Sequence, residues 1–369
     1  MSRPARILIA AGGTGGHVYP AIAVADAVKR KEPASALAFA GTTDRIEWEA
    51  VPRAGYPIYP ITAAALNRAD KLANLRVPGR LAKGLYQSYR LVHEFDADLV
   101  FGAGGFVAGP VGVAAWMGKR PLVLQEQNAY AGVTNRLLGR LAEQVHIAFP
   151  EATEAFPEGR VLLSGNPTRS ALKGVQQSPA RRRMGIPEDA RVLLVFGGSL
   201  GSQALNEALM ETVHLFLEGT DAHLIWQTGR RYHERVRAAI APTDRLHILE
   251  YLHDMPAAYA CADLAMCRAG ASTCAELLVT GTPAILVPSP NVAEDHQTHN
   301  ARSVVAAGAA RILPEPQLVS EWVAMASSLL DDRDAREAMR SAARRHAVED
   351  AAERIATSLL DLAGRRAAA

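Results

Sequence analysis

The sequence predicts an α/β protein built from two doubly wound parallel-sheet domains. Short apolar runs of strand type alternate with longer amphipathic stretches of helical type, the pattern of parallel strands joined by crossover helices. The alternation restarts near the middle of the chain, and each half opens with a strand followed by a glycine-rich turn. At 369 residues the chain exceeds one typical core, so two domains are the default expectation.

The expected elements follow in order along the chain. Strands of the first half are expected at 7–10, 37–40, 58–61, 99–101, 122–125, 145–149 and 161–164. The stretch 168–189 holds Pro179 and Pro187 and shows no strand pattern. Strands of the second half are expected at 192–196, 224–227, 246–249, 264–267, 284–287 and 311–313, and the chain beyond Ser320 is helical and charged. We therefore place the first domain at 1–166 and the second at 167–345.

The composition is that of an ordinary globular protein. A hydrophobic content of 49% with 21% charged residues argues against disorder, and a net charge of +2 argues against nucleic-acid binding by bulk charge. The three cysteines lack CxxC spacing, which favours small buried hydrophobes in a reducing compartment over disulfides or metal ligands: Cys261, Cys267 and Cys274. The uncharged stretch 99–117 is rich in glycine, so strand, loop and short helix suit it better than a membrane span. The N-terminal residues run directly into the first expected strand, so we expect no signal peptide.

The stretch 11–17 places four glycines in the turn between the first strand and a helix. Such a turn lets a ligand approach the backbone, and the helix N-terminus favours an anion. No Lys-Ser/Thr pair follows, and the spacing fails GxGxxG, so neither a Walker motif nor a dinucleotide fingerprint is present. His17 ends the loop and is either a general base or a helix-capping histidine. The loops 12–17, 102–109 and 126–128 each follow a strand and should converge.

The stretch 268–276 also joins a strand to a helix, and two interpretations stay open. Ser272 or Thr273 could cap the helix, with Glu276 completing a capping box. Alternatively, a diphosphate could bind the free amides of 270–273 while Glu276 accepts hydrogen bonds from both hydroxyls of a ribose.

The loop 288–301 is polar and follows a core strand, which indicates contact with solvent or ligand. His296, His299 and Asp295 show no clean metal-ligand spacing. The acidic pair in 96–98 precedes its strand, so it should point away from the loops. We expect no metal.

The stretch 68–90 interleaves basic and apolar residues against the single acid Asp70. It fits either a solvated amphipathic helix or a patch that binds an anionic membrane surface. The candidate patch comprises Leu72, Leu75, Arg76, Arg80, Leu81, Lys83 and the aromatic anchor Trp116.

Together these motifs resemble those of the MurG family of bacterial peptidoglycan N-acetylglucosaminyltransferases. The matching residues run in family order from residue 7 to about 313: 12–17 with Pro20, Gly41-Thr42 with Glu49, 102–106, 126–128 with 131–132, 165–167 with Arg169, 197–201, 268–276, and 296–297 with 300–301. Two departures are small. Ser202 stands where the family has Ala, and Thr168 where it has Val.

The resemblance implies a GT-B fold, in which two Rossmann-like domains face a central cleft and a last helix, about 346–369, crosses back to the first domain. It implies inverting transfer of GlcNAc from UDP-GlcNAc to the C4 hydroxyl of MurNAc in lipid I, giving the β-1,4 link of lipid II, without metal or cofactor. The implied donor contacts are Arg169, Ser199, Leu252, Gly270, Ala271, Ser272, Thr273, Glu276, His296 and Gln297. Thr14, Gly15, Gly16 and Asn128 are expected toward the sugar and acceptor, and His17 is our candidate base.

An enzyme of this family would act in peptidoglycan synthesis, and so in cell-wall growth, shape and division. It would sit peripherally on the cytoplasmic face of the plasma membrane, with proteins of the cell-wall or division machinery as possible partners. Three alternatives remain: a UDP-GlcNAc epimerase or other GT-B nucleotide-sugar enzyme, a binding subunit that needs a catalytic partner, and an NAD-dependent oxidoreductase. The failed GxGxxG disfavours the last, and the basic-apolar stretch favours a lipid-linked acceptor over the epimerase.

Overall fold

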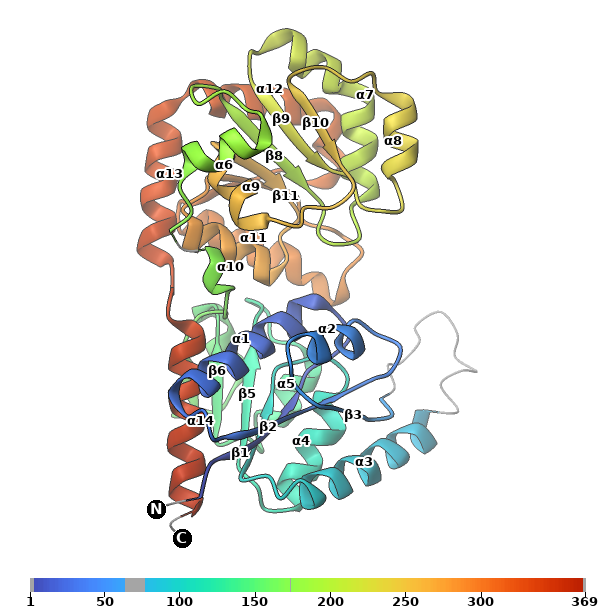
Figure 1. The fold of residues 1–369 in the computed structure, drawn as a ribbon, viewed down its shortest axis with the longest axis vertical. Coiled ribbons are helices and arrows are strands. Elements are labelled where there is room, and N and C mark those ends of the chain that lie inside the picture. Colours follow the sequence, from blue (N-terminus) through green and yellow to red (C-terminus); the bar gives the residue numbers. More distant parts are fainter. Residues whose placement is uncertain (1–2, 64–76, 173, 368–369) are drawn as a thin grey trace. The chain divides into compact units, whose positions relative to one another are not determined.

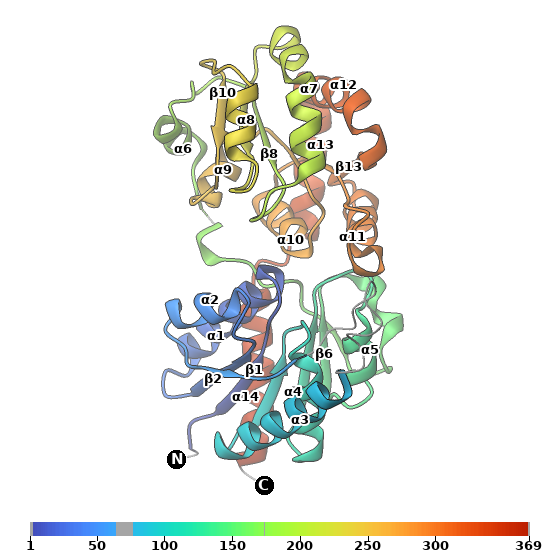
Figure 2. The same ribbon diagram turned by 90° about the vertical axis from the view of Figure 1, so that its right-hand side faces the viewer.

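The computed structural model describes residues 3–63, 77–172 and 174–367. They form two compact units, one made of Met1–Arg169 with Glu349–Ala369 and the other of Ser170–Val348. Each unit is built on one parallel sheet with helices on both faces (Figures 1 and 2). The predicted fold class, with two doubly wound parallel sheets, is confirmed.

The sheet of the first unit has the strand order β3-β2-β1-β4-β5-β6-β7. Its strands are β1 (Arg6–Ala10), β2 (Ala36–Gly41), β3 (Ile58–Pro60), β4 (Leu99–Gly102), β5 (Leu122–Glu126), β6 (Gln144–Ile147) and β7 (Val161–Leu163). Its helices are α1 (Gly15–Lys31), α2 (Glu47–Arg53), α3 (Val77–Glu94), α4 (Ala108–Met117), α5 (Val133–Leu138), the short η2 (Pro150–Ala155) and α14 (Ala351–Ala367).

The sheet of the second unit has the strand order β10-β9-β8-β11-β12-β13. Its strands are β8 (Val192–Phe196), β9 (His223–Gln227), β10 (Leu246–Leu249), β11 (Leu264–Cys267), β12 (Ala284–Leu286) and β13 (Ala310–Ile312). Its helices are η3 (Ser170–Leu172), α6 (Gln177–Met184), α7 (Gln203–Gly219), α8 (His233–Ala239), α9 (Met255–Cys261), α10 (Ala271–Thr280), η4 (Ala293–Asp295), α11 (His296–Ala306), η5 (Glu315–Gln317), α12 (Leu318–Asp331) and α13 (Arg333–His346).

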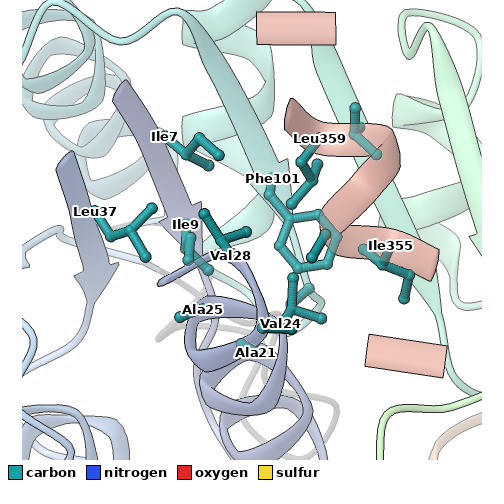
Figure 3. Packing of buried hydrophobic residues seen from close by; sticks show 14 of the residues in the cluster. Ile7, Ile9, Ala21, Val24, Ala25, Val28, Leu37, Phe101, Ile355 and Leu359 are labelled. Atoms are coloured by element: carbon teal, nitrogen blue, oxygen red, sulfur yellow. The ribbon is translucent and has the colours of Figure 1, made fainter. Parts of the chain in front are cut away.

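The continuous apolar run of β1 has a direct structural cause. Parallel strands covered by helices on both faces bury every side chain, so they show no alternation of apolar and polar residues. Ile7 and Ile9 point to one face and pack against α1 and α14, while Leu8 joins the core on the other face. Figure 3 shows the first of these cores, where Phe101 from β4 meets Ile355 and Leu359 from α14.

Helix α14 belongs to the first unit although it lies at the end of the chain. Its apolar face contributes Ala352, Ile355, Ala356, Leu359, Leu362 and Ala363 to the core beneath α1. At the surface, Arg30 of α1 pairs with Glu353 at 2.9 Å. This burial explains why the charged C-terminal stretch is helical. No described helix is both long and apolar enough to span a membrane.

Each sheet reverses its strand order at one point, between β1 and β4 in the first unit and between β8 and β11 in the second. Loops that follow the two strands flanking such a point lie side by side at the carboxyl edge of the sheet, where ligands of doubly wound folds bind. All four of these loops carry glycine: 11–16, 102–105, 197–201 and 268–270. The topology therefore gives each unit one candidate binding edge.

Candidate active site

The first glycine loop leads from β1 into α1. Thr14 is the N-cap residue, with extended backbone and no side-chain capping bond, and its side chain is exposed. The backbone amide of His17 donates to the carbonyl of Thr14 at 3.1 Å. The amides of Gly15 and Gly16, in the first helical turn, have no partner within the helix. These two amides point out of a helix N-terminus, where an anion is stabilised.

Glu47, a residue that the sequence did not single out, holds this loop in place. Its side chain is fully buried, and its carboxylate accepts bonds from the amide of Gly13 (3.1 Å), the amide of Thr42 (3.1 Å) and the Thr42 hydroxyl (2.7 Å). A Cβ at residue 12 would lie 2.7 Å from its Oε1, which accounts for Gly12. Glu49, which the family motif was expected to supply, is exposed and pairs with Arg53.

The second glycine loop, after β4, packs directly on the first. Gly104 and Gly105 have φ of 104° and 81°, in the left-handed region that favours glycine. A Cβ at Gly105 would collide with the carbonyl oxygen of Gly12, and a Cβ at Gly104 would collide with the ring of His17. The predicted convergence of these loops is therefore confirmed.

The third segment of this edge is Glu126-Gln127-Asn128, after β5. His17 Nδ1 lies 3.2 Å from Gln127 Oε1, so the candidate base contacts this segment directly. Glu126 is buried, and its Oε1 accepts bonds from the Asn128 amide (2.9 Å) and side chain (3.1 Å). Its Oε2 accepts from the Gly132 amide (3.0 Å) and the Asn135 side chain (2.9 Å). Glu126 thus fixes the position of Asn128.

In the second unit, the glycine loop 197–201 carries Ser199, which is exposed. Ser202, where the family has Ala, is the N-cap of α7, and its hydroxyl accepts from the Leu205 amide at 3.4 Å. The same hydroxyl accepts from Arg268 Nε at 3.0 Å. Arg268 also donates to the carbonyls of Val287 (3.1 Å) and Pro288 (3.3 Å), so it ties the loops after three strands together.

The capping-box interpretation of 268–276 is wrong. The N-cap of α10 is Gly270, without a side-chain cap, so Ser272 and Thr273 lie inside the first turn rather than before it. The first-turn amides of residues 271–273 therefore have no partner within the helix. The Ser272 hydroxyl oxygen is buried and has no hydrogen-bond partner among the described residues. The N-terminus of α10 therefore offers first-turn amides and the Ser272 hydroxyl as groups that could bind a diphosphate.

Glu276 lies further into α10, and its Oε2 accepts a bond from the Tyr259 hydroxyl at 3.0 Å. Tyr259, on α9, is buried and contacts Phe196 edge-on at a ring-centroid distance of 5.9 Å. The sequence did not indicate Tyr259. Leu252 precedes α9 and is buried. Tyr259 therefore orients the carboxylate predicted to bind ribose.

Helix α11 begins with His296 and Gln297. His296 is partly exposed, and its Nδ1 lies 2.8 Å from the carbonyl of Ala293. Gln297 Oε1 accepts from the Ser289 amide at 2.9 Å, and the buried Asn300 donates to the carbonyl of Ala269 at 3.2 Å. The Gln297 bond attaches the start of α11 to the loop after β12, and the Asn300 bond attaches α11 to the loop before α10. Arg169, the remaining predicted donor contact, is exposed and ends the N-terminal segment of the first unit.

Two further sequence predictions concern metal ligands and the cysteines. The described residues contain no group of His, Cys, Asp and Glu able to hold a metal ion. Asp98 instead accepts from the Arg6 amide at 2.9 Å and pairs with Arg3, at the amino end of β4 and away from the loops. All three cysteines are buried and free, and burial raises the pKa of Cys274 to about 12, so its thiol stays protonated.

The membrane patch is described only in part, because Leu72, Leu75 and Arg76 lie outside the described residues. Arg80, Leu81 and Lys83 are exposed on α3, as is Trp116 on α4. Gly84 faces Pro110 and Gly118 faces His93, so α3 and α4 run side by side in the same direction. Trp116 therefore lies near the C-terminal end of α3, about 15 Å along the helix from Lys83.

Comparisons with known proteins agree with this geometry. The chain matches the glycosyltransferase family 28 N-terminal domain over residues 7–147 and the C-terminal domain over residues 192–355. It is 52% identical over 364 residues to the UDP-N-acetylglucosamine--N-acetylmuramyl-(pentapeptide) pyrophosphoryl-undecaprenol N-acetylglucosamine transferase of Salinibacter ruber, covering 99% of this chain and 98% of the relative.

Two solved structures bear on the fold. Acinetobacter baumannii MurG matches with a TM-score of 0.78 and 31% identity, covering 97% of this chain and 100% of that chain. The UDP-GlcNAc 2-epimerase of Neisseria meningitidis matches with a TM-score of 0.66 but 13% identity, covering 96% and 100%, and so shares the fold alone. The chain belongs to glycosyltransferase family 28, and within it to the MurG family.

Proposed function

We propose that this protein transfers GlcNAc from UDP-GlcNAc to the C4 hydroxyl of MurNAc in lipid I, forming lipid II with inversion at the sugar. The observation that carries the proposal is the 52% identity with the Salinibacter ruber transferase across 99% of the chain. The glycine-rich loops at the carboxyl edges of both sheets support it, because they carry the residues expected to bind donor and acceptor. The reaction would serve peptidoglycan synthesis, and so cell-wall growth and division.

The donor site is proposed on the second unit. The diphosphate would bind at the first-turn amides of α10, with the unpartnered Ser272 hydroxyl and Ser199 alongside. The Glu276 carboxylate, held by Tyr259, would accept hydrogen bonds from both hydroxyls of the ribose. The backbone at Leu252 would contact the uracil, and His296 and Gln297 would contact the nucleotide sugar. Arg169, which directly precedes the second unit in the chain, is proposed as a further contact to the nucleotide sugar.

The acceptor site is proposed on the first unit. The amides of Gly15 and Gly16, with Thr14, would meet the lipid diphosphate, and Asn128 would face the sugars. His17 would remove the proton from the acceptor C4 hydroxyl, whose oxygen forms the new bond to C1 of GlcNAc. The bond from C1 to the UDP oxygen breaks, and its electron pair leaves with UDP. Positive potential at the α10 N-terminus would stabilise that leaving group, without a metal or cofactor.

A lipid-linked acceptor requires the enzyme to work at a membrane. The exposed Arg80, Leu81 and Lys83 of α3 support a peripheral site, since basic and apolar groups on one helix bind anionic surfaces. We propose that this face meets the cytoplasmic leaflet.

The decisive assay incubates the purified protein with labelled UDP-GlcNAc, with and without a lipid I analogue. Label that moves to the lipid only when the acceptor is present supports the proposal. Consumption of UDP-GlcNAc without acceptor would instead identify an epimerase, and binding without turnover a carrier subunit. His93→Ala, at an exposed histidine on α3, is the control for His17→Ala, which should lose most of its kcat.

A further inference from the structure

A buried side-chain amide joins the candidate base to the backbone of the second glycine loop. Gln127 directly follows β5 and is 1% exposed. Its Nε2 lies 2.5 Å from the carbonyl oxygen of Ala103, and its Oε1 lies 3.2 Å from His17 Nδ1. Ala103 is fully buried, and its own amide donates to the carbonyl of Ala10 at 2.8 Å. The carbonyl that receives Gln127 is therefore held rigidly by the sheet.

This arrangement fixes which way the Gln127 amide faces. A backbone carbonyl only accepts hydrogen bonds, so the atom against Ala103 must be the NH₂ group and not the amide oxygen. The oxygen then faces His17 Nδ1 and can only accept. The hydrogen of a neutral His17 must therefore sit on Nδ1, and its lone pair on Nε2.

We propose that Gln127 is a positioning residue that holds His17 in the Nδ1–H tautomer, so that Nε2 is the nitrogen that receives the acceptor proton. The inference rests on the proposed role of His17 as base. Gln127 does this without charge, unlike the carboxylate that orients histidine in hydrolase triads. The ring also abuts Gly104, where a Cβ would collide with it, so backbone and amide together set its orientation.

The two buried carboxylates at this edge accept hydrogen bonds from other groups. Glu47 accepts three hydrogen bonds, from Gly13 and from Thr42. Glu126 accepts four, from Asn128, Gly132 and Asn135. Both are thus engaged by other donors.

The direct test is ¹⁵N NMR of protein labelled at histidine side chains, with His17 assigned by difference against His17→Asn. The wild type should show the Nδ1–H tautomer, and Gln127→Met, which keeps the volume but loses both hydrogen bonds, should shift the ring toward the Nε2–H form. Gln125→Met is the matched control, because it removes a buried side-chain amide two residues earlier, on β5, that contacts Asn166 instead. It should leave the His17 tautomer unchanged. A wild-type ring in the Nε2–H form would overturn the proposal, whatever the variants do.

Kinetics give a second readout. Gln127→Met should lower kcat roughly tenfold to hundredfold, a part of what a general base contributes, while KM for UDP-GlcNAc stays within about twofold. An unchanged kcat in Gln127→Met beside an inactive His17→Ala would refute the positioning role and leave the base in place. Full activity in His17→Ala would refute the role of His17 as general base. The tautomer measurement would still test whether Gln127 sets the His17 tautomer.

Discussion

Replacing Glu47 by glutamine should destabilise the first unit even though the side chain keeps its shape. The carboxylate accepts bonds on both oxygens, with Thr42 at Oε1 and the Gly13 amide at Oε2. A glutamine amide offers one oxygen and one NH₂ group, so in either orientation the NH₂ faces a backbone N–H. One donor therefore loses its acceptor at a buried side chain.

The magnitude follows from that lost acceptor. A buried donor left without a partner costs about 1–3 kcal/mol. For a unit of this size each kcal/mol lowers the melting temperature by roughly 2–4 °C, so Glu47→Gln should lose about 2–12 °C. Glu47→Ala, which strands both backbone amides, should lose more.

Calorimetry on the whole chain measures this, with Glu49→Gln as the matched control on the same helix. Glu49 is exposed and pairs with Arg53, an interaction worth roughly 0–1 kcal/mol, so its loss should barely shift the transition. Equal melting temperatures for Glu47→Gln and Glu49→Gln would show that Glu47 does not anchor the loop.

Three further outcomes are expected. Glu276→Ala should weaken UDP binding roughly tenfold or more, since it removes a charged acceptor from the proposed ribose site, and an unchanged Kd by titration calorimetry would contradict that role. Reversing Arg80 and Lys83 to glutamate should reduce co-sedimentation with anionic vesicles, and equal binding of mutant and parent would count against the membrane face. Burial lowers the pKa of His146 to about 4, so the unfolded chain binds more protons between pH 4 and 6.5 and stability falls as the pH drops through that window. The wild type should therefore lose about 2 kcal/mol more than His146→Gln between pH 7 and pH 5 in denaturant titrations, and parallel losses would contradict the assignment.

The fold was predictable because buried parallel strands have a distinctive pattern. Runs such as 7–10 and 192–196 are apolar at every position, and in the structure they are the central strands β1 and β8 of the two sheets. The stretch 168–189 was less informative. Its basic and proline-rich composition concealed α6, which ends where Gly185 turns with φ of 68°.

The site was predictable where glycine marks it and unpredictable where single polar side chains hold it. Gly104 and Gly105 signal the close approach of two loops. Glu47, Gln127 and Tyr259 act through contacts between distant segments, which spacing alone does not encode. One signal was present for Glu47: it lies four residues before the buried Val51, on the inner face of α2. The capping-box pattern at 272–276 led to a wrong prediction, because the N-cap of α10 is Gly270, two residues before Ser272.

The central claim is transfer of GlcNAc to a lipid-linked acceptor with inversion, and NMR of the product tests it most directly. Incubation of the protein with UDP-GlcNAc and a lipid I analogue should yield a disaccharide in which GlcNAc is β-linked to C4 of MurNAc, with one UDP released per linkage. A product that forms without the acceptor, or a GlcNAc that keeps the α configuration of the donor, would contradict the account.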